Sequence, residues 1–235
     1  MFDVLEKLFN LYKFDHKLIR QVASGSRYFA IELLNGNIGV CATLGKTINP
    51  KLPDKLNLDN INHRIILCAY YNALVNYRSP NISPAGDITQ AVNFKKYQNI
   101  HFVGKFAPVF EKLEKQNISF TYADLRDQDD PQNRLKDQTQ LLNTADCVVI
   151  SATAVYNGTL PYLIRQSPNA DRFLLGPSST MSPILCEAGF KAVFGSQFKP
   201  YDSRVLGLIA QNYGTKYFLR RGTKTMLSCE STQKN

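Results

Sequence analysis

Five short apolar segments between residues 100 and 195 alternate with segments of helical pattern, and this alternation constrains the fold more than any other feature. The apolar segments are IHFVG (100–104), ISFTYADL (118–125), DCVVIS (146–151), RFLLG (172–176) and KAVFG (191–195). Helical patterns follow them near 107–116, 132–143, 159–166, 183–188 and 201–213. Repeated strand–helix pairs predict an α/β fold, in which a parallel sheet carries helices on both faces.

The pattern before residue 90 is different. RYFAIELL and NIGVCATL flank Asn35-Gly36, and this dipeptide suits a tight turn with positive φ at both central positions. The second segment alternates apolar residues with polar or small ones, as expected for a strand buried on one side. A helix is expected over 60–77, with Asp59 as its N-cap.

These patterns divide the chain into three parts. Residues 1–90 are expected to form an α+β domain, 91–225 a Rossmann-like α/β domain, and 226–235 a flexible tail. The segment 79–99 contains two prolines and a glycine, and it is expected to be a linker with one helical turn.

Composition and charge exclude some classes of protein. No apolar run reaches the roughly 18 residues that a membrane span needs. The first residues, MFDVLEKLFNLYKF, mix acids and bases with apolar residues, so they predict an amphipathic helix rather than a signal peptide, and a cytoplasmic protein. The net charge is +9, but the basic residues are dispersed, so nucleic-acid binding is the least favoured function.

The cysteines and histidines show no local metal motif. The five cysteines, at positions 41, 68, 147, 186 and 229, include no C-x-x-C pair and are expected to be reduced and buried. The three histidines, at positions 16, 63 and 101, include no H-x-x-x-H pair. A metal site would therefore need ligands that converge only in the folded protein.

Parallel sheets bind ligands beyond the carboxyl ends of their strands, so the loops there are the candidate site. The first is Gly104-Lys105-Phe106, where the glycine permits a tight turn and Lys105 adds positive charge near a helix N-terminus. Asp124 follows Gly104 by twenty residues, about the spacing of a ribose-binding acid in dinucleotide-binding folds. The alternative for Asp124 is a solvated loop acid or an N-cap.

Two further loops are rich in small polar residues. SATAVYNGTL (151–160) contributes Thr153, Asn157, Gly158 and Thr159, of which Asn157 or Thr159 can cap the next helix.

The loop GPSSTMSP (176–183) contains Gly176 and Pro177 followed by three hydroxyl residues. Ser182 suits the N-cap of the following helix. Ser178, Ser179 and Thr180 are then expected to line a pocket, and a plain hydroxyl-rich turn is the alternative.

Asn72 is a polar residue on an otherwise apolar stripe of the helix expected over 60–77. At 100° per residue it shares a narrow arc with Ile65 and Cys68, and Asn76 lies close by. A buried amide needs hydrogen-bond partners. Asn72 either bonds to neighbouring backbone groups or faces a ligand cleft.

The chain contains neither a G-x-S-x-G motif nor a Walker motif, and neither His63 nor His101 has an acid or a nucleophile beside it. His101 falls within an expected strand, where a core histidine with satisfied partners is typical. No acid–base mechanism can be assigned, and whether the protein is an enzyme stays open.

DCVVISATAVYNGTLPYLI and FLLGPSSTMSPILCEAGFKAVFGSQF resemble the family described as putative heavy-metal chelation. VGKFAPVFEKL, NGNIGVCAT and AYYNALVNY resemble other parts of that family, over most of residues 25–220. The resemblance implies an N-terminal domain like the capping domain of enolase, a Rossmann-like domain and a site in the cleft between them. It implies cleft positions for Asn72, Gly104, Phe106, Asn157, Gly158, Thr159, Gly176, Pro177 and Ser178. The second loop, DLRDQDDP, departs from the family pattern.

Three functions are therefore carried forward. The first is a binding protein or enzyme for a polar or anionic small molecule, nucleotide-like or metal-chelating, in an interdomain cleft. The second is a non-catalytic chaperone for a metal or a metallophore, and the third is nucleic-acid binding. A metal ion or a nucleotide-like molecule is the candidate cofactor. A homodimer is a candidate assembly, although the sequence identifies no interface for it.

Overall fold

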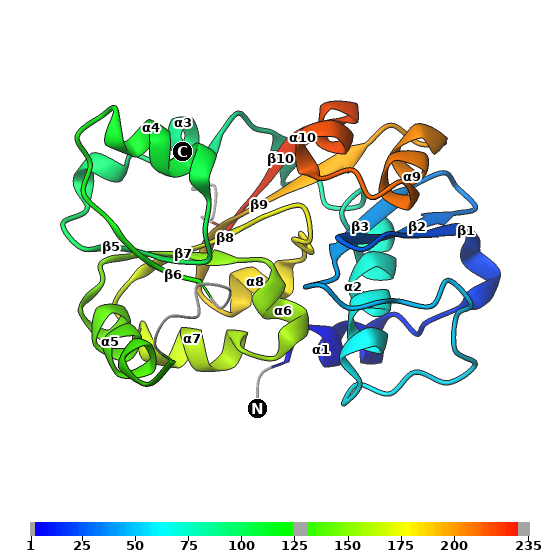
Figure 1. The fold of residues 1–235 in the computed structure, drawn as a ribbon, viewed down its shortest axis with the longest axis horizontal. Helices are drawn as coiled ribbons and strands as arrows, with labels where there is room; N and C mark the ends of the chain where they lie inside the picture. Colours follow the sequence, from blue (N-terminus) through cyan, green and yellow to red (C-terminus); the bar gives the residue numbers. More distant parts are fainter. Residues whose placement is uncertain (1–2, 125–130, 230–235) are drawn as a thin grey trace.

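The computed structural model describes residues 3–124 and 131–229 and contains two sheets (Figure 1). The smaller sheet has the order β1-β2-β3, with β1 (Ile19–Ser24), β2 (Tyr28–Leu33) and β3 (Ile38–Ala42) antiparallel. The hairpin predicted at Asn35-Gly36 is present between β2 and β3, and Gly36 has φ +84°. Asn35 does not have positive φ, so the expectation of positive φ at both central positions is wrong. Helix α1 (Val4–Leu11) and the 3₁₀ turn η1 (His16–Leu18) precede this sheet.

Helix α2 (Ile61–Val75) packs closely against β2 and β3. The absence of a side chain at Gly39 allows this approach, since a Cβ there would lie 2.1 Å from the carbonyl oxygen of Ala69. The helix is capped by Asn60, whose side chain accepts a hydrogen bond from the N–H of Asn62. The N-cap is therefore Asn60, one residue after the expected Asp59.

The larger sheet has the order β4-β10-β9-β8-β7-β5-β6. Its parallel part consists of β5 (Ile100–Val103), β6 (Thr121–Ala123), β7 (Cys147–Ser151), β8 (Asp171–Leu175) and β9 (Phe190–Phe198). This confirms the predicted Rossmann-like sheet. The chain places β6 on one side of β5 and β7 on the other, so the strand order reverses between β5 and β7.

Helices cover both faces of this sheet, as predicted (Figure 1). One face carries α3 (Ile88–Ala91) and α4 (Ala107–Glu114) over a cluster that includes Phe102 and Phe173. Other helices lie on the opposite side, over a cluster that includes Val148 and Leu174. They are α5 (Pro131–Thr144), α6 (Thr153–Asn157), α7 (Leu160–Gln166) and α8 (Pro183–Glu187).

The expected linker and tail contain regular structure. Residues 79–99 include β4 (Ile82–Pro84), α3 and the 3₁₀ turn η2 (Phe94–Lys96), and β4 forms an edge of the larger sheet. The expectation of a flexible tail from residue 226 is wrong for residues 226–228, because β10 (Gly222–Ser228) pairs with β4 and β9. Residues 230–235 lie outside the described residues.

A disulfide joins Cys186 in α8 to Cys229, with 5.0 Å between the Cα atoms. The expectation of reduced thiols is wrong for this pair, because Cys229 follows a strand rather than lying in a tail. Cys41, Cys68 and Cys147 are free and buried.

The two sheets are linked by elements from both ends of the chain. Helix α9 (Ser203–Ala210) packs on β1 and β2, and α10 (Thr215–Phe218) and the 3₁₀ turn η3 (Leu219–Arg221) follow it. The domain boundary at residue 90 stays a prediction, since β4 lies before it in the larger sheet. None of the helices in the described part of the chain combines the length and apolar character that crossing a membrane requires.

Candidate functional site

Three loops meet at the carboxyl ends of β5, β7 and β8, where the strand order reverses. Gly104 follows β5 with φ +115°, and a Cβ there would lie 3.0 Å from the Cβ of Ser151 at the end of β7. Gly176 follows β8 with φ +143°, and a Cβ there would lie 3.4 Å from the Cβ of Ala152. Both positions have positive φ, a backbone conformation that favours glycine. The absence of a side chain at each also leaves space between these loops.

The loops after β5 and β6 are bonded to each other. The N–H of Lys105 donates to Asp124 Oδ2 at 2.7 Å, and the N–H of Gly104 donates to the Ala123 carbonyl at 2.7 Å. The Lys105 ammonium lies 5.7 Å from the ring centre of Tyr122. Asp124 therefore lies at the end of β6, bonded to the loop after β5, and its role as a ligand contact stays a prediction. The residues that follow it, 125–130, lie outside the described part.

Helix α4 begins directly after this loop. Phe106, its N-cap residue, provides no capping side chain, and Pro108 lies in the first turn. The Phe106 ring is half-buried and packs near Phe102, with 6.1 Å between the ring centres. A helix N-terminus beside a lysine favours an anionic ligand.

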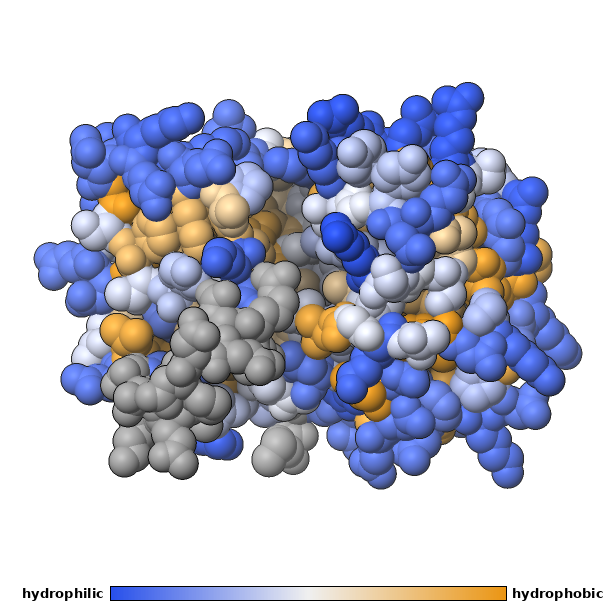
Figure 2. Space-filling view, viewed as in Figure 1, coloured by the Kyte–Doolittle hydropathy of each residue, from blue (hydrophilic) through white to orange (hydrophobic). Residues whose placement is uncertain are grey.

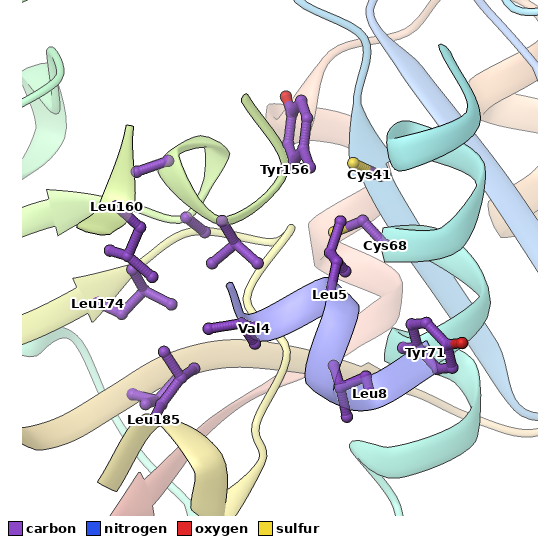
Figure 3. Close-up of a cluster of buried hydrophobic side chains, with 14 of the residues drawn as sticks. Val4, Leu5, Leu8, Cys41, Cys68, Tyr71, Tyr156, Leu160, Leu174 and Leu185 are labelled. Atoms are coloured by element: carbon purple, nitrogen blue, oxygen red, sulfur yellow. The ribbon is translucent and has the colours of Figure 1, made fainter. Parts of the chain in front are cut away.

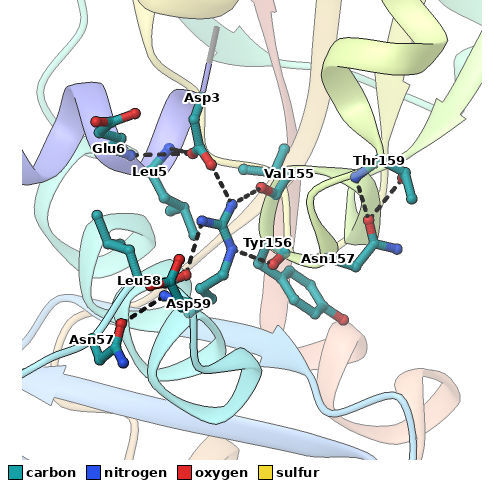
Figure 4. Close-up of polar contacts among 11 residues, drawn as sticks. Asp3, Leu5, Glu6, Asn57, Leu58, Asp59, Val155, Tyr156, Asn157 and Thr159 are labelled. Atoms are coloured by element: carbon teal, nitrogen blue, oxygen red, sulfur yellow. Dashed lines mark hydrogen bonds and ion pairs between the residues drawn. The ribbon is translucent and has the colours of Figure 1, made fainter. Parts of the chain in front are cut away.

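The loop after β7 is organised by its own hydroxyl and amide groups. Ser151 Oγ lies 3.0 Å from Thr153 Oγ1. Asn157 Oδ1 accepts hydrogen bonds from the N–H and the hydroxyl of Thr159, at 3.0 and 2.7 Å (Figure 4). Gly158, with φ +80°, ends α6, so Asn157-Gly158-Thr159 forms the junction of α6 and α7.

The hydroxyl residues of the loop after β8 lie inside the protein. Ser178, Ser179 and Thr180 are 2%, 0% and 0% exposed. Ser178 Oγ accepts from the N–H of Ala42 at 2.9 Å, and Ser179 Oγ donates to the Phe194 carbonyl at 2.7 Å. The structure thus gives no support to an open pocket lined by these hydroxyls, because each is bonded to a neighbouring element. Pro177 beside them is half-buried, and Ser182 caps α8 as expected.

A polar stripe on α2 holds these loops in place. It consists of Arg64, Cys68, Asn72 and Asn76, spaced four residues apart. Asn76 Nδ2 donates to the Ser179 carbonyl at 2.8 Å, and Asn76 Oδ1 accepts from the N–H of Met181 at 2.7 Å. Asn72 is 1% exposed, and its Nδ2 donates to the Val40 carbonyl at 2.9 Å. These bonds favour the structural alternative for Asn72.

Arg64 is the member of the stripe that sequence reasoning missed. Its guanidinium forms an ion pair with Asp3 at 2.8 Å and donates to the carbonyls of Val155 and Tyr156, at 3.1 and 2.5 Å (Figure 4). Arg64 is 8% exposed, so its charge is buried. Its partners lie just before α1 and in α6, and Arg64 therefore joins both of these segments to α2. Arg64 lies four residues before Cys68, about one helical turn, and this spacing is the sequence signal that could have placed Arg64 on the same stripe.

Two free thiols and a tyrosine hydroxyl, from β3, α2 and α6, are buried in the interior of the protein (Figure 3). Cys41, Cys68 and Tyr156 are each 0% exposed. Burial raises the pKa of the Cys41 thiol well above its ordinary value, and the adjacent Cys68 thiol raises it further. Burial also raises the pKa of Tyr156, whose hydroxyl has no hydrogen-bond partner among the described residues.

His101 lies within β5, away from the strand end. It is 1% exposed, and its Nδ1 lies 2.8 Å from Thr121 Oγ1, whereas Nε2 has no partner among the described residues. Burial lowers the pKa of His101 to about 4. The ring is therefore neutral near pH 7, with one of its two nitrogens bonded.

A surface cavity of about 350 Å³ lies elsewhere, between residues 48–54 and the first turns of α2. None of the loop residues predicted from the sequence lines it. The site at the strand-end loops therefore rests on the strand order, and it stays a prediction.

A sequence model of the family described as "Putative heavy-metal chelation" (DUF364) matches residues 87–228. The chain belongs to this family. Two solved structures of proteins with unknown function from the DUF364 family are similar to it. The one from Pyrococcus horikoshii is 19% identical, with a TM-score of 0.76 over 95% of this chain and 97% of that chain. The one from Desulfitobacterium hafniense is 19% identical, with a TM-score of 0.68 over 96% of each chain. A search of curated proteins found no match.

The description of the DUF364 family names heavy-metal chelation, and a metal site would need side chains that can act as ligands. Within residues 3–124 and 131–229 no group of three or more His, Cys, Asp or Glu side chains is placed to hold a metal ion. The donors that do lie together are the thiols of Cys41 and Cys68, beside the unbonded hydroxyl of Tyr156. These described donors do not form a three- or four-coordinate metal cage.

Proposed function

We propose that this protein binds a polar or anionic small molecule, nucleotide-like or metal-chelating, at the carboxyl ends of β5, β7 and β8. The reversal of strand order between β5 and β7 carries the proposal, because open α/β sheets bind ligands at such points. Figure 2 shows a recess near the middle of one face, between the two halves of the molecule, which supports it.

Each loop has a distinct part in this proposal. The N-terminus of α4 and Lys105 attract the anionic portion of the ligand, and Gly104 and Gly176 allow it to approach the backbone. Asp124 and Thr153 supply polar contacts at the same edge. Asn72, Ser178 and Ser179 support the loops from inside through the bonds described above.

The proposal assigns binding and no reaction. The described groups in the strand-end loops are hydroxyls, the Asn157 amide, the Asp124 carboxylate and the Lys105 ammonium, and the buried His101 lies within β5 rather than at its end. We therefore name no catalytic residue.

Native mass spectrometry of freshly purified protein, with elemental analysis of the same sample, is the first test. A bound organic mass near that of a nucleotide, without stoichiometric metal, supports the proposal. One metal per chain without an organic molecule supports instead the alternative of a non-catalytic metal chaperone, which the family description favours.

A glycine pair provides the matched test with added probes. Gly104→Ala places a methyl group at a positive-φ position beside Ser151, whereas Gly207→Ala in α9 adds one where nothing lies within 4 Å. We expect ADP or ferric citrate to raise the melting temperature of the wild type and of Gly207→Ala, but not of folded Gly104→Ala. A response of Gly104→Ala equal to the wild type would contradict the proposed place of binding.

Location, assembly and nucleic-acid binding are separate proposals. The disulfide is unusual for a reducing compartment, so the thiol state of protein taken from cells tests the proposed cytoplasmic location. Light scattering after gel filtration tests the homodimer. Several basic side chains are paired, such as Lys112 and Lys224 with Asp87, which leaves nucleic-acid binding the least favoured function.

A further inference from the structure

We infer that the surface cavity between residues 48–54 and the first turns of α2 binds a zwitterionic amino acid with an aliphatic side chain. The cavity holds about 350 Å³. This volume is near the lower end of the roughly 300–1,000 Å³ that is typical of small-molecule sites. None of the strand-end loop residues lines the cavity, so the inference does not depend on the function proposed above. Figure 1 shows the segment between β3 and α2 on the side of α2 that faces away from the larger sheet.

The buried part of the cavity lining is apolar. Ile48, from the segment between β3 and α2, is 1% exposed, and Ile66, from α2, is 3% exposed. Leu52 and Pro53 are half-buried and line the same cavity. An aliphatic side chain gains free energy by leaving water for such a surface, whereas a polar side chain would lose its hydration there.

Two opposite charges line the same cavity. Lys51 and Asp54 are both exposed, and neither forms an ion pair within the described part of the chain. An amino acid carries a carboxylate for Lys51 and an ammonium for Asp54 on one small skeleton. A molecule with a single charge would leave one of the two side chains without a partner, so the pair selects a zwitterion.

Two neutral polar side chains of the lining have hydrogen-bonding capacity that the protein does not use. The Nδ1 of His63 accepts from the N–H of Asn57 at 2.9 Å, so the neutral ring carries its proton on Nε2. That N–H makes no hydrogen bond within the described residues and suits the ligand carboxylate. Asn62 Oδ1 is buried and likewise has no partner among the described residues. Rotation of the Asn62 amide would turn this oxygen towards the ligand ammonium.

The wall of the cavity is held in place by the protein's own hydrogen bonds. Ser24 Oγ, at the end of β1, donates to the carbonyl of Ile48 at 2.5 Å. Asn49 Oδ1 accepts from the N–H of Lys51 at 2.9 Å, and the bond of His63 to Asn57 joins the other end of the segment to α2. A ligand that enters a preformed cavity loses less affinity to the ordering of the protein.

The first test is calorimetric titration of the full chain with matched probes. They are L-leucine, isocaproate, which lacks the amino group, isoamylamine, which lacks the carboxylate, and L-serine, which lacks the aliphatic side chain. We expect L-leucine to bind at least about tenfold more tightly than each of the other three, because each lacks one group that the cavity recognises.

Matched variants assign the two charges. We expect Lys51→Ala to weaken the binding of L-leucine and isocaproate by about tenfold, and Asp54→Ala to weaken that of L-leucine and isoamylamine by the same factor but not that of isocaproate. Lys55→Ala and Asp59→Ala are the controls, since both residues are exposed, lie in the same segment and do not line the cavity. These controls should keep the wild-type affinity, and circular dichroism checks that all four variants fold.

The histidines give a readout that needs no change in the cavity. Of the three in the sequence, His63 lines the cavity, whereas His16 and His101 do not. In proton NMR spectra, L-leucine should shift the ring signals of His63 and leave those of His16 unchanged, with the signals assigned from the spectrum of His63→Gln.

Four outcomes would overturn the inference. They are no binding of L-leucine to the wild type at millimolar concentration, equal affinity for L-leucine and the single-charge analogues, unchanged L-leucine affinity in both Lys51→Ala and Asp54→Ala, and L-leucine binding that leaves the His63 signals unmoved.

Discussion

Thr180 Oγ1 donates a hydrogen bond to Asn72 Oδ1 at 2.5 Å, although 108 positions separate the two residues. Both are buried, so this bond joins the last turn of α2 to the loop after β8. Asn76 adds two bonds to the same loop. Gly176 lies four residues before Thr180, so its position depends partly on α2, the helix that packs against the smaller sheet.

We expect Asn72→Ala to lower the free energy of unfolding by about 2–3 kcal/mol, because it leaves the Val40 carbonyl and the Thr180 hydroxyl without a partner. Urea denaturation measures the change. The control is Asn81→Ala, an exposed position, for which a change within about 0.5 kcal/mol is expected. Equal effects of the two substitutions would show that the Asn72 bonds add nothing.

We expect Arg64→Met to lower the free energy of unfolding by about 3 kcal/mol or more, because it leaves Asp3 and two buried carbonyls without their donor. Arg165→Met is the comparison, since Arg165 is exposed and lies 5.9 Å from the ring centre of Tyr162. Its loss should be below about 1 kcal/mol. Calorimetry of both variants decides whether Arg64 is the structural centre that its contacts indicate.

Because burial lowers the pKa of His101, we expect the folded protein to lose stability in weak acid. Its pKa is about 4 in the folded protein, below the ~6.5 of an unfolded chain, so the unfolded state binds the proton more readily as the pH falls. The free energy of unfolding should then drop by about 2 kcal/mol between pH 7 and pH 5. His101→Gln should remove this part of the drop, and His16→Gln, at an exposed position, should keep it. Parallel losses in the wild type and His101→Gln would assign the effect to other groups.

Reduction of the Cys186–Cys229 disulfide should destabilise the protein. The two cysteines are 43 positions apart, and the chain-entropy model gives about 4 kcal/mol of stabilisation for a closed loop of that length. Measured disulfide contributions are usually about 2–4 kcal/mol. Urea denaturation with and without dithiothreitol measures the loss. The double variant Cys186→Ala/Cys229→Ala should show no response to dithiothreitol. A wild type that is equally stable in both conditions would mean that the bond does not form.

Local sequence signals predicted the parts of the fold that local chemistry determines. Asn35-Gly36 identified the hairpin because its turn needs positive φ, and the apolar segments identified β5, β7, β8 and β9 because strands buried on both faces are continuously apolar. The N-cap at Ser182 could also be predicted locally, because the group that Ser182 caps, the N–H of Ile184, is two residues away.

Long-range contacts explain what the sequence did not predict. The run Ser178–Thr180 looks the same whether it faces solvent or bonds to Ala42, Asn72 and Phe194, and those partners are distant along the chain. The last residues of β10, 226–228, were assigned to a tail, yet Leu227 is buried, as is Thr225 two residues before it, while Lys224 is exposed. Cys186 and Cys229 come together only once β10 pairs with β9.

The edge of the larger sheet has a consequence for synthesis of the chain. β4 and β9 both pair with β10 (Gly222–Ser228), which follows both of them along the chain. A nascent chain therefore exposes one side of β9, which reads FKAVFGSQF, until residues 222–228 have also left the ribosome. Unpaired strand edges invite association with other chains. A stop codon shortly before residue 222 would thus produce a polypeptide with most of its core and an open edge, which makes it a substrate for chaperones and proteases.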